Sequence, residues 1–93
     1  MATQFESIEK EEIAQLSFPK SEVLQDIAEI KQRFSDLNRA LSLGNLEHSK
    51  IKIYFEDNQS KKVVETTVWG LTDQRVILKQ GNVIPIHRIF KSA

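Results

Sequence analysis

The residues of this chain whose types suit chemistry are mainly aromatic and basic, and the chemistry that they suit is binding. Trp69 is the only tryptophan, and Tyr54, Arg75 and Arg88 fall in or beside predicted strands. An exposed indole beside a phenol ring and two guanidinium groups makes a stacking and cation–π surface for a nucleic-acid base or a peptide. His87 is a further candidate contact. The alternative for Trp69 is a structural role, in which its ring covers the sheet against a helix.

Patterns typical of enzymes and metal sites do not occur in the sequence. It has no cysteine, and neither of its histidines, His48 and His87, has a partner at metal-ligand spacing. HExxH, GxSxG and glycine-rich phosphate loops are missing as well. Glu56 and Asp57 are adjacent carboxylates, but they fall at a predicted turn, where such groups are normally solvated. We therefore expect no enzymatic activity, no metal site and no cofactor.

Length and composition predict one domain spanning residues 1–93, with a helical segment at 1–44 and a β segment at 45–93. Hydrophobic residues make up 40% and charged residues 28%, as in ordinary globular proteins. No apolar run is long enough to span a membrane, and the N-terminus lacks the pattern of a signal peptide. Together with the absence of cysteine, this favours a cytoplasmic protein without membrane contacts.

The net charge is zero, but the two halves of the chain differ. Residues 1–46 carry five basic and eight acidic side chains, and residues 47–93 carry eight basic and five acidic ones. The basic side chains of the second half are Lys50, Lys52, Lys61, Lys62, Arg75, Lys79, Arg88 and Lys91. They favour contact with a polyanion if they share one side of the fold. The alternative is a solvated surface that protects the sheet edges.

Two helices are expected to precede the β segment. The first covers about residues 6–16 and ends before Phe18-Pro19, because proline removes a donor and disfavours the helical region for the residue before it. The second covers residues 21–43, with Ser21 as N-cap and Gly44 just beyond its end. These elements would lie on one side of the sheet.

The second helix carries an apolar stripe with steps of four and three residues. Its members are Val23, Ile27, Ile30, Phe34, Leu37 and Leu41. One interpretation is that the stripe packs onto the rest of the chain. The other is that Ile27, Ile30, Phe34 and Leu37 mediate self-association between two copies.

The β segment contains short runs of β-branched and aromatic residues separated by turn residues, the pattern of an antiparallel meander. We expect strands at 50–56, 63–69, 75–79 and 83–86, with a last extended piece at 90–91. Val83–Ile86 is expected at a sheet edge because Pro85 cannot donate to a ladder. The predicted class is therefore α+β, with two helices followed by a four- to five-stranded meander or small barrel.

This order of elements over residues 50–93 resembles the Sm-like and SH3-like small β-barrels, and the whole chain looks like small bacterial proteins of unassigned function. In bacterial Sm-like RNA chaperones a Tyr-Lys-His type motif lies in the final segments, and Pro85-Ile86-His87-Arg88 occupies a comparable place here. The resemblance implies that His87 and Arg88 are similar to RNA-contacting positions.

Two functions follow from these patterns. The first is a non-enzymatic interaction module, which binds a protein partner or a second copy through the helical stripe or the Val83–Ile86 edge. The second is an Sm-like module that binds single-stranded RNA or DNA through its basic β half, with Tyr54, Trp69, Arg75, His87 and Arg88 as contacts.

Overall fold

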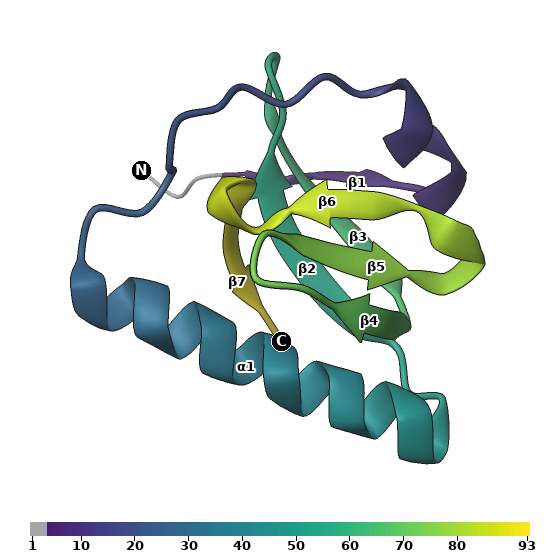
Figure 1. Ribbon diagram of the computed structural model, residues 1–93. Helices are drawn as coiled ribbons and strands as arrows, with labels where there is room; N and C mark the ends of the chain where they lie inside the picture. Colours follow the sequence, from purple (N-terminus) through teal and green to yellow (C-terminus); the bar gives the residue numbers. More distant parts are fainter. Residues whose placement is uncertain (1–3) are drawn as a thin grey trace.

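The computed structural model describes residues 4–93 and confirms the α+β class (Figure 1). In chain order the elements are β1 (Glu6–Ile8), η1 (Lys10–Gln15), α1 (Ile27–Glu47), β2 (Ile51–Glu56), β3 (Lys61–Thr66), β4 (Val68–Leu71), β5 (Arg75–Leu78), η2 (Lys79–Gly81), β6 (Val83–Pro85), η3 (Ile86–Arg88) and β7 (Ile89–Ser92). The η segments are single or double turns of 3-10 helix. The prediction of two N-terminal helices is therefore wrong, because only one long helix forms in the described part of the chain.

Where the first helix was expected, the chain forms a strand and a 3-10 segment. Strand β1 pairs in parallel with β3, so that Glu6 lies opposite Lys62 and Ile8 opposite Val64. The following η1 is closed by a local capping box, in which the amide of Glu9 donates to Glu12 at 2.8 Å. It buries Ile13, which is 2% exposed. Pairing with a distant strand thus overrides the local preference for helix.

The long helix begins six residues later and ends four residues later than predicted. Asp26 is its N-cap and accepts a bond from the amide of Ala28 at 2.8 Å. Its C-cap is His48, which adopts the left-handed conformation with φ 55°. Gly44, predicted to stop the helix, lies inside it and is buried against the backbone of Val68. Glycine is needed there for close packing rather than for a turn.

The strands form two sheets, one with the order β1-β3-β2-β7 and one with the order β4-β5-β6. The predicted strand positions are confirmed to within a few residues, and β6 is the predicted edge strand with Pro85. The predicted strand at 63–69 is divided, since pairing stops at Thr67 and β4 continues into the other sheet. A bulge follows in β4, where the register shifts between Val68 and Gly70.

The β part is mixed rather than wholly antiparallel, because β1 runs parallel to β3 and the last strand returns to β2. Of the two alternatives, an open meander and a small closed barrel, the strand ladders of residues 4–93 form no closed barrel, because both sheets are open. In Figure 1 the three-stranded sheet lies in front of β2 and β3, and α1 passes below β4.

One core fills the space between the sheets and α1. It includes Ile53 and Phe55 from β2, Val76 and Leu78 from β5, and Leu37 from α1, each 0% exposed. Burying a side chain of this size contributes about 1.5–3 kcal/mol. Alternate residues of β2 and of β5 therefore face the core.

Candidate interaction surfaces

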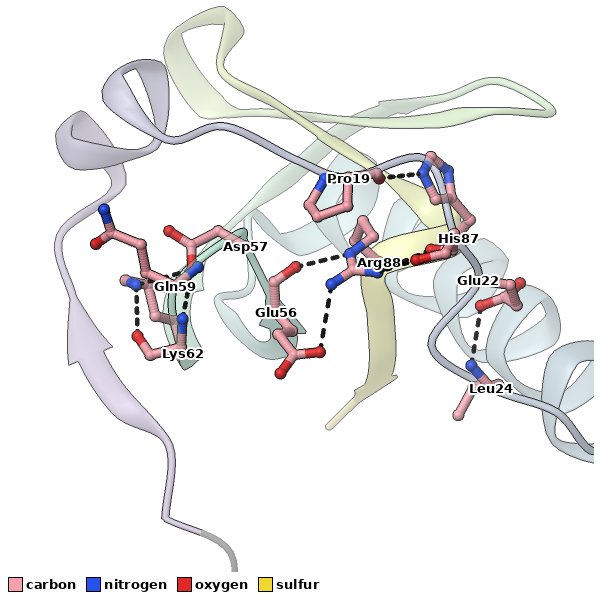
Figure 2. Close-up of polar contacts among 11 residues, drawn as sticks. Pro19, Glu22, Leu24, Glu56, Asp57, Gln59, Lys62, His87 and Arg88 are labelled. Atoms are coloured by element: carbon pink, nitrogen blue, oxygen red, sulfur yellow. Dashed lines mark hydrogen bonds and ion pairs between the residues drawn. The ribbon is translucent and has the colours of Figure 1, made fainter.

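His87 and Arg88 hold the segment that joins η1 to α1, which we call the strap (residues 16–26). His87 Nε2 lies 2.9 Å from the carbonyl oxygen of Pro19, and the His87 carbonyl accepts from the amide of Val23 at 2.9 Å. Arg88 donates to the Ser21 carbonyl at 2.8 Å. Figure 2 shows the contact between His87 and Pro19, which joins the turn before β7 to the strap.

The guanidinium of Arg88 is almost completely enclosed, since the residue is 6% exposed. Its Nε donates to the Glu56 carbonyl at 3.0 Å, and Nη2 lies 3.3 Å from the Glu56 carboxylate. Each donating nitrogen of Arg88 therefore has a protein acceptor. Arg88 therefore links β2 and the strap to η3, and its guanidinium has no nitrogen left without a protein acceptor to bind a ligand.

A second arginine fixes the position of α1. Arg33 is 4% exposed and makes two contacts of 2.7 Å with the carboxylate of Glu22, while its Nη1 also donates to the Ile89 carbonyl at 2.9 Å. Burial alone would raise the pKa of Glu22, but hydrogen bonds from Arg33 and the Leu24 amide outweigh it, and the pKa is lowered. This pair anchors the strap to the helix.

The β2–β3 turn contains a buried ion pair where the sequence predicts solvated carboxylates. Asp57 is 3% exposed, and its Oδ1 accepts from the amides of Gln59 and Ser60 and from Lys62 Nζ at 3.0 Å (Figure 2). Burial acts to raise the pKa of Asp57, but the two amides and the Lys62 ammonium lower it more strongly. The arrangement closes the hairpin and leaves no free carboxylate pair.

The other predicted contact residues are divided between the two sheets. Trp69 is 52% exposed and sits at the bulge of β4, so it is not a core residue. Arg75 is exposed on β5 in the same sheet. Tyr54 belongs to the four-stranded sheet, where its ring packs edge-on against Phe5 at 5.0 Å between ring centres. The structure thus does not assemble Tyr54, Trp69, Arg75 and Arg88 into one surface.

The helical stripe is divided between the core and the surface. Leu37 is 0% exposed, whereas Phe34 is 44% and Ile27 is 69% exposed. The face of α1 that packs on the sheets consists of Arg33, Leu37, Ala40 and Gly44. Compared with the predicted stripe, α1 is rotated about its axis so that Ala40 and Gly44 face the sheets. Gly44 lets the helix approach the β4 backbone, and Arg33 lies close enough to pair with Glu22. Of the four predicted self-association residues, Ile27, Ile30 and Phe34 remain at least partly accessible.

A groove of about 460 Å³ runs beside this accessible flank of α1. Its lining residues are Ile30, Lys31, Arg33, Phe34, Ser35, Asp73 and Ile86. Asp73 comes from the β4–β5 turn and Ile86 from η3. The sequence offers no signal that these two residues border the helix, because the contact depends on how α1 is rotated.

Among residues 4–93, no three His, Cys, Asp or Glu side chains come together as metal ligands. The same residues contain no helix with the length and apolar character needed to cross a bilayer. No protein family model, curated protein or solved structure matches this chain.

Proposed function

We propose that this chain is a non-enzymatic interaction module that self-associates through α1. The observation that carries the proposal is the exposure of Ile27 and Phe34, 69% and 44%, on a helix whose other apolar face is already buried. Large apolar side chains grouped on one flank of a helix indicate an interaction site more often than single exposed ones do.

The pattern of this flank favours a second copy as the partner. Ile27, Phe34 and Leu41 recur every seven residues and lie along one line of α1, with Ile27 and Phe34 exposed and Leu41 half-buried at the border with the core. An antiparallel two-fold crossing at Phe34 places Ile27 of one copy opposite Leu41 of the other, so the surface is complementary to itself. Between Ile27 and Leu41, this flank of the described helix carries one charged residue, Lys31. The flank therefore brings few charges together when two copies meet.

The sheet edge is the weaker place for such an interface. Strand β6 is an edge strand but has three residues, and Pro85 lacks an amide donor. The amide of Ile86 already donates to the Gln74 carbonyl at 2.9 Å. Short edges with proline are typical of sheets protected against pairing.

We further propose that the β part is an SH3-like or Sm-like arrangement, as found among small bacterial proteins. The support is the strand order, with β7-β2-β3 in one sheet and β4-β5-β6 in the other. The chain passes from β3 directly into β4, and the 3-10 turn η3 precedes the last strand. Strand order alone does not assign a function.

The arrangement of the two copies can be tested by disulfide cross-linking, because the chain has no cysteine of its own. We expect an equimolar mixture of the Ile27→Cys and Leu41→Cys proteins to form the mixed disulfide under mild oxidation, since only an antiparallel crossing at Phe34 brings these positions together. Gln32→Cys, on the opposite flank, is the matched control. Equal rates for the mixed pair and for Gln32→Cys would refute this interface.

A further inference from the structure

The outer face of the four-stranded sheet carries three aromatic rings, of which Phe5 touches the other two. Phe5 lies edge-on to Tyr54 at 5.0 Å and to Phe90 at 5.7 Å between ring centres. The three rings come from the residue before β1, from β2 and from β7, and each is half-buried. Tyr54 points away from the core, because its neighbours Ile53 and Phe55 face inward with 0% exposure.

Two lysines lie over these rings. Lys91 Nζ is 5.0 Å from the centre of the Tyr54 ring, and Lys61 Nζ is 5.3 Å from the centre of the Phe90 ring. Neither lysine forms an ion pair with a described carboxylate. We call Phe5, Tyr54, Phe90, Lys61 and Lys91 the aromatic–lysine platform.

The acidic side chains near the platform have other basic neighbours. Glu56 is the strand partner of Lys61, but its carboxylate lies 3.3 Å from Arg88. Glu6, next to Phe5, lies 3.8 Å from Lys62 Nζ, and Glu65, on the outer face of β3, is the strand partner of Lys52. The platform thus holds two lysines that form no ion pair with a described carboxylate, although the whole chain is neutral.

We propose that the aromatic–lysine platform binds single-stranded nucleic acid through its bases and phosphates. A base stacks on the Tyr54 or Phe90 ring, and the displaced lysine ammonium pairs with a neighbouring phosphate. Cation–π contacts at accessible sites are weak compared with base stacking on an aromatic ring, so the exchange is favourable. Planar groups alternating with negative charges are a property of nucleic acid, whereas an acidic peptide supplies the charges alone.

This inference is independent of the proposed self-association, because the platform uses no residue of α1. It also differs from the surface predicted from the sequence: of the five contacts predicted there only Tyr54 belongs to the platform, whereas Lys61 and Lys91 come from the wider basic set. Trp69 lies in the other sheet, so its fluorescence should not change when the platform is occupied.

The experiment measures the fluorescence anisotropy of a labelled, mixed-sequence 12-nucleotide RNA and its DNA equivalent, titrated with the full chain from about 50 to 200 mM salt. Each phosphate contact on a single strand contributes about 0.7 to the slope of log K against log salt, so Lys61→Gln/Lys91→Gln should make the slope shallower by about 1.4. Lys79→Gln, a lysine of η2 in the other half of the β part, is the matched control and should keep the original slope.

The rings are tested separately with Tyr54→Leu and Phe90→Leu, which retain apolar packing against Phe5. Each should weaken binding by about tenfold through lost stacking, while circular dichroism confirms the fold. Three results would overturn the proposal: no binding at about 50 mM salt, an unchanged slope in the lysine double variant, or equally tight binding of a poly-glutamate peptide. The last would assign the platform to an acidic protein segment instead.

Discussion

Replacing Gly44 with alanine tests whether this glycine holds α1 close to β4. In an exposed helix interior the change would stabilise the protein by about 1 kcal/mol, because alanine has the higher helix propensity. At Gly44, however, a Cβ would collide with the carbonyl oxygen of Val68 and lie 3.1 Å from Thr67 Cγ2. The carbonyl belongs to the backbone and cannot rotate away, so the helix itself must move.

The two effects oppose each other, and the steric one should win. Overpacking a tight site costs about 1–3 kcal/mol, and displacing α1 also loosens Leu37, which is 0% exposed. We expect Gly44→Ala to lower the free energy of unfolding by about 2 kcal/mol, which is a fall of about 8–16 °C in Tm for a domain of this size. If Gly44 only ended the helix, replacing it with alanine would lower the free energy of unfolding by less.

The assay is thermal and urea unfolding followed by circular dichroism at the helix signal. Ser42→Ala is the matched control, since Ser42 is exposed on the same helix and should gain stability from propensity alone. Gly44→Ala with wild-type or higher stability would refute the account of how α1 packs.

The remaining predictions concern the core, the turn and the strap. Leu37→Ala should cost about 2–5 kcal/mol in urea unfolding, whereas Phe34→Ala should cost under about 1 kcal/mol, because only Leu37 is fully buried; equal losses would contradict the observed rotation of α1. The pKa of Asp57 is below its ordinary value of 3.8 in the folded state, because the amides of Ser60 and Gln59 and the Lys62 ammonium outweigh its burial. The stability that these bonds give is therefore full above about pH 4 and is lost as the pH falls through the lowered pKa. In Asp57→Asn the free energy of unfolding should fall less steeply as the pH is lowered. An equally steep fall in the variant would be evidence against this role of Asp57. Arg88→Lys should release the strap, because a single ammonium cannot replace the several donors of the guanidinium. Faster amide exchange at residues 20–23 is the readout, and unchanged exchange would count against the role of Arg88.

The strands were predictable because their information is local. Alternation in Ile51–Glu56 and the β-branched runs at Val76 and Ile84 identify inward faces without knowledge of the partners. Proline likewise predicted the edge position of β6. These features depend on side-chain period and turn residues alone.

The N-terminal segment and the rotation of α1 were not predictable because they depend on distant partners. Strand β1 forms only where β3 offers an edge. The stripe of α1 contains more apolar residues than its true core face, but Gly44 fits the β4 backbone and Arg33 is paired with Glu22. Neither fact is visible from helical spacing.

The predicted binding site also differs from the observed surfaces because it depends on residues that are distant in the sequence. The sequence suggests that Arg88 is an exposed basic residue, yet acceptors from two distant segments, Ser21 of the strap and Glu56 of β2, bind its guanidinium. Phe5 and Phe90 were overlooked because the rings become neighbours only when β1 and β7 join the sheet. The local signals of the aromatic–lysine platform were the outward position of Tyr54 in the alternation of β2 and the basic side chains Lys61 and Lys91.

Self-association through α1 is tested most directly by the solution mass, measured by light scattering behind a sizing column at a low and a high protein concentration. We expect the mass to rise with concentration from the 10.7 kDa of one copy toward twice that value. Phe34→Lys should abolish the rise while the fold is retained, and Gln32→Lys on the opposite flank should not affect it. A mass of one copy at both concentrations, or a dimer that persists in Phe34→Lys, would contradict the proposal.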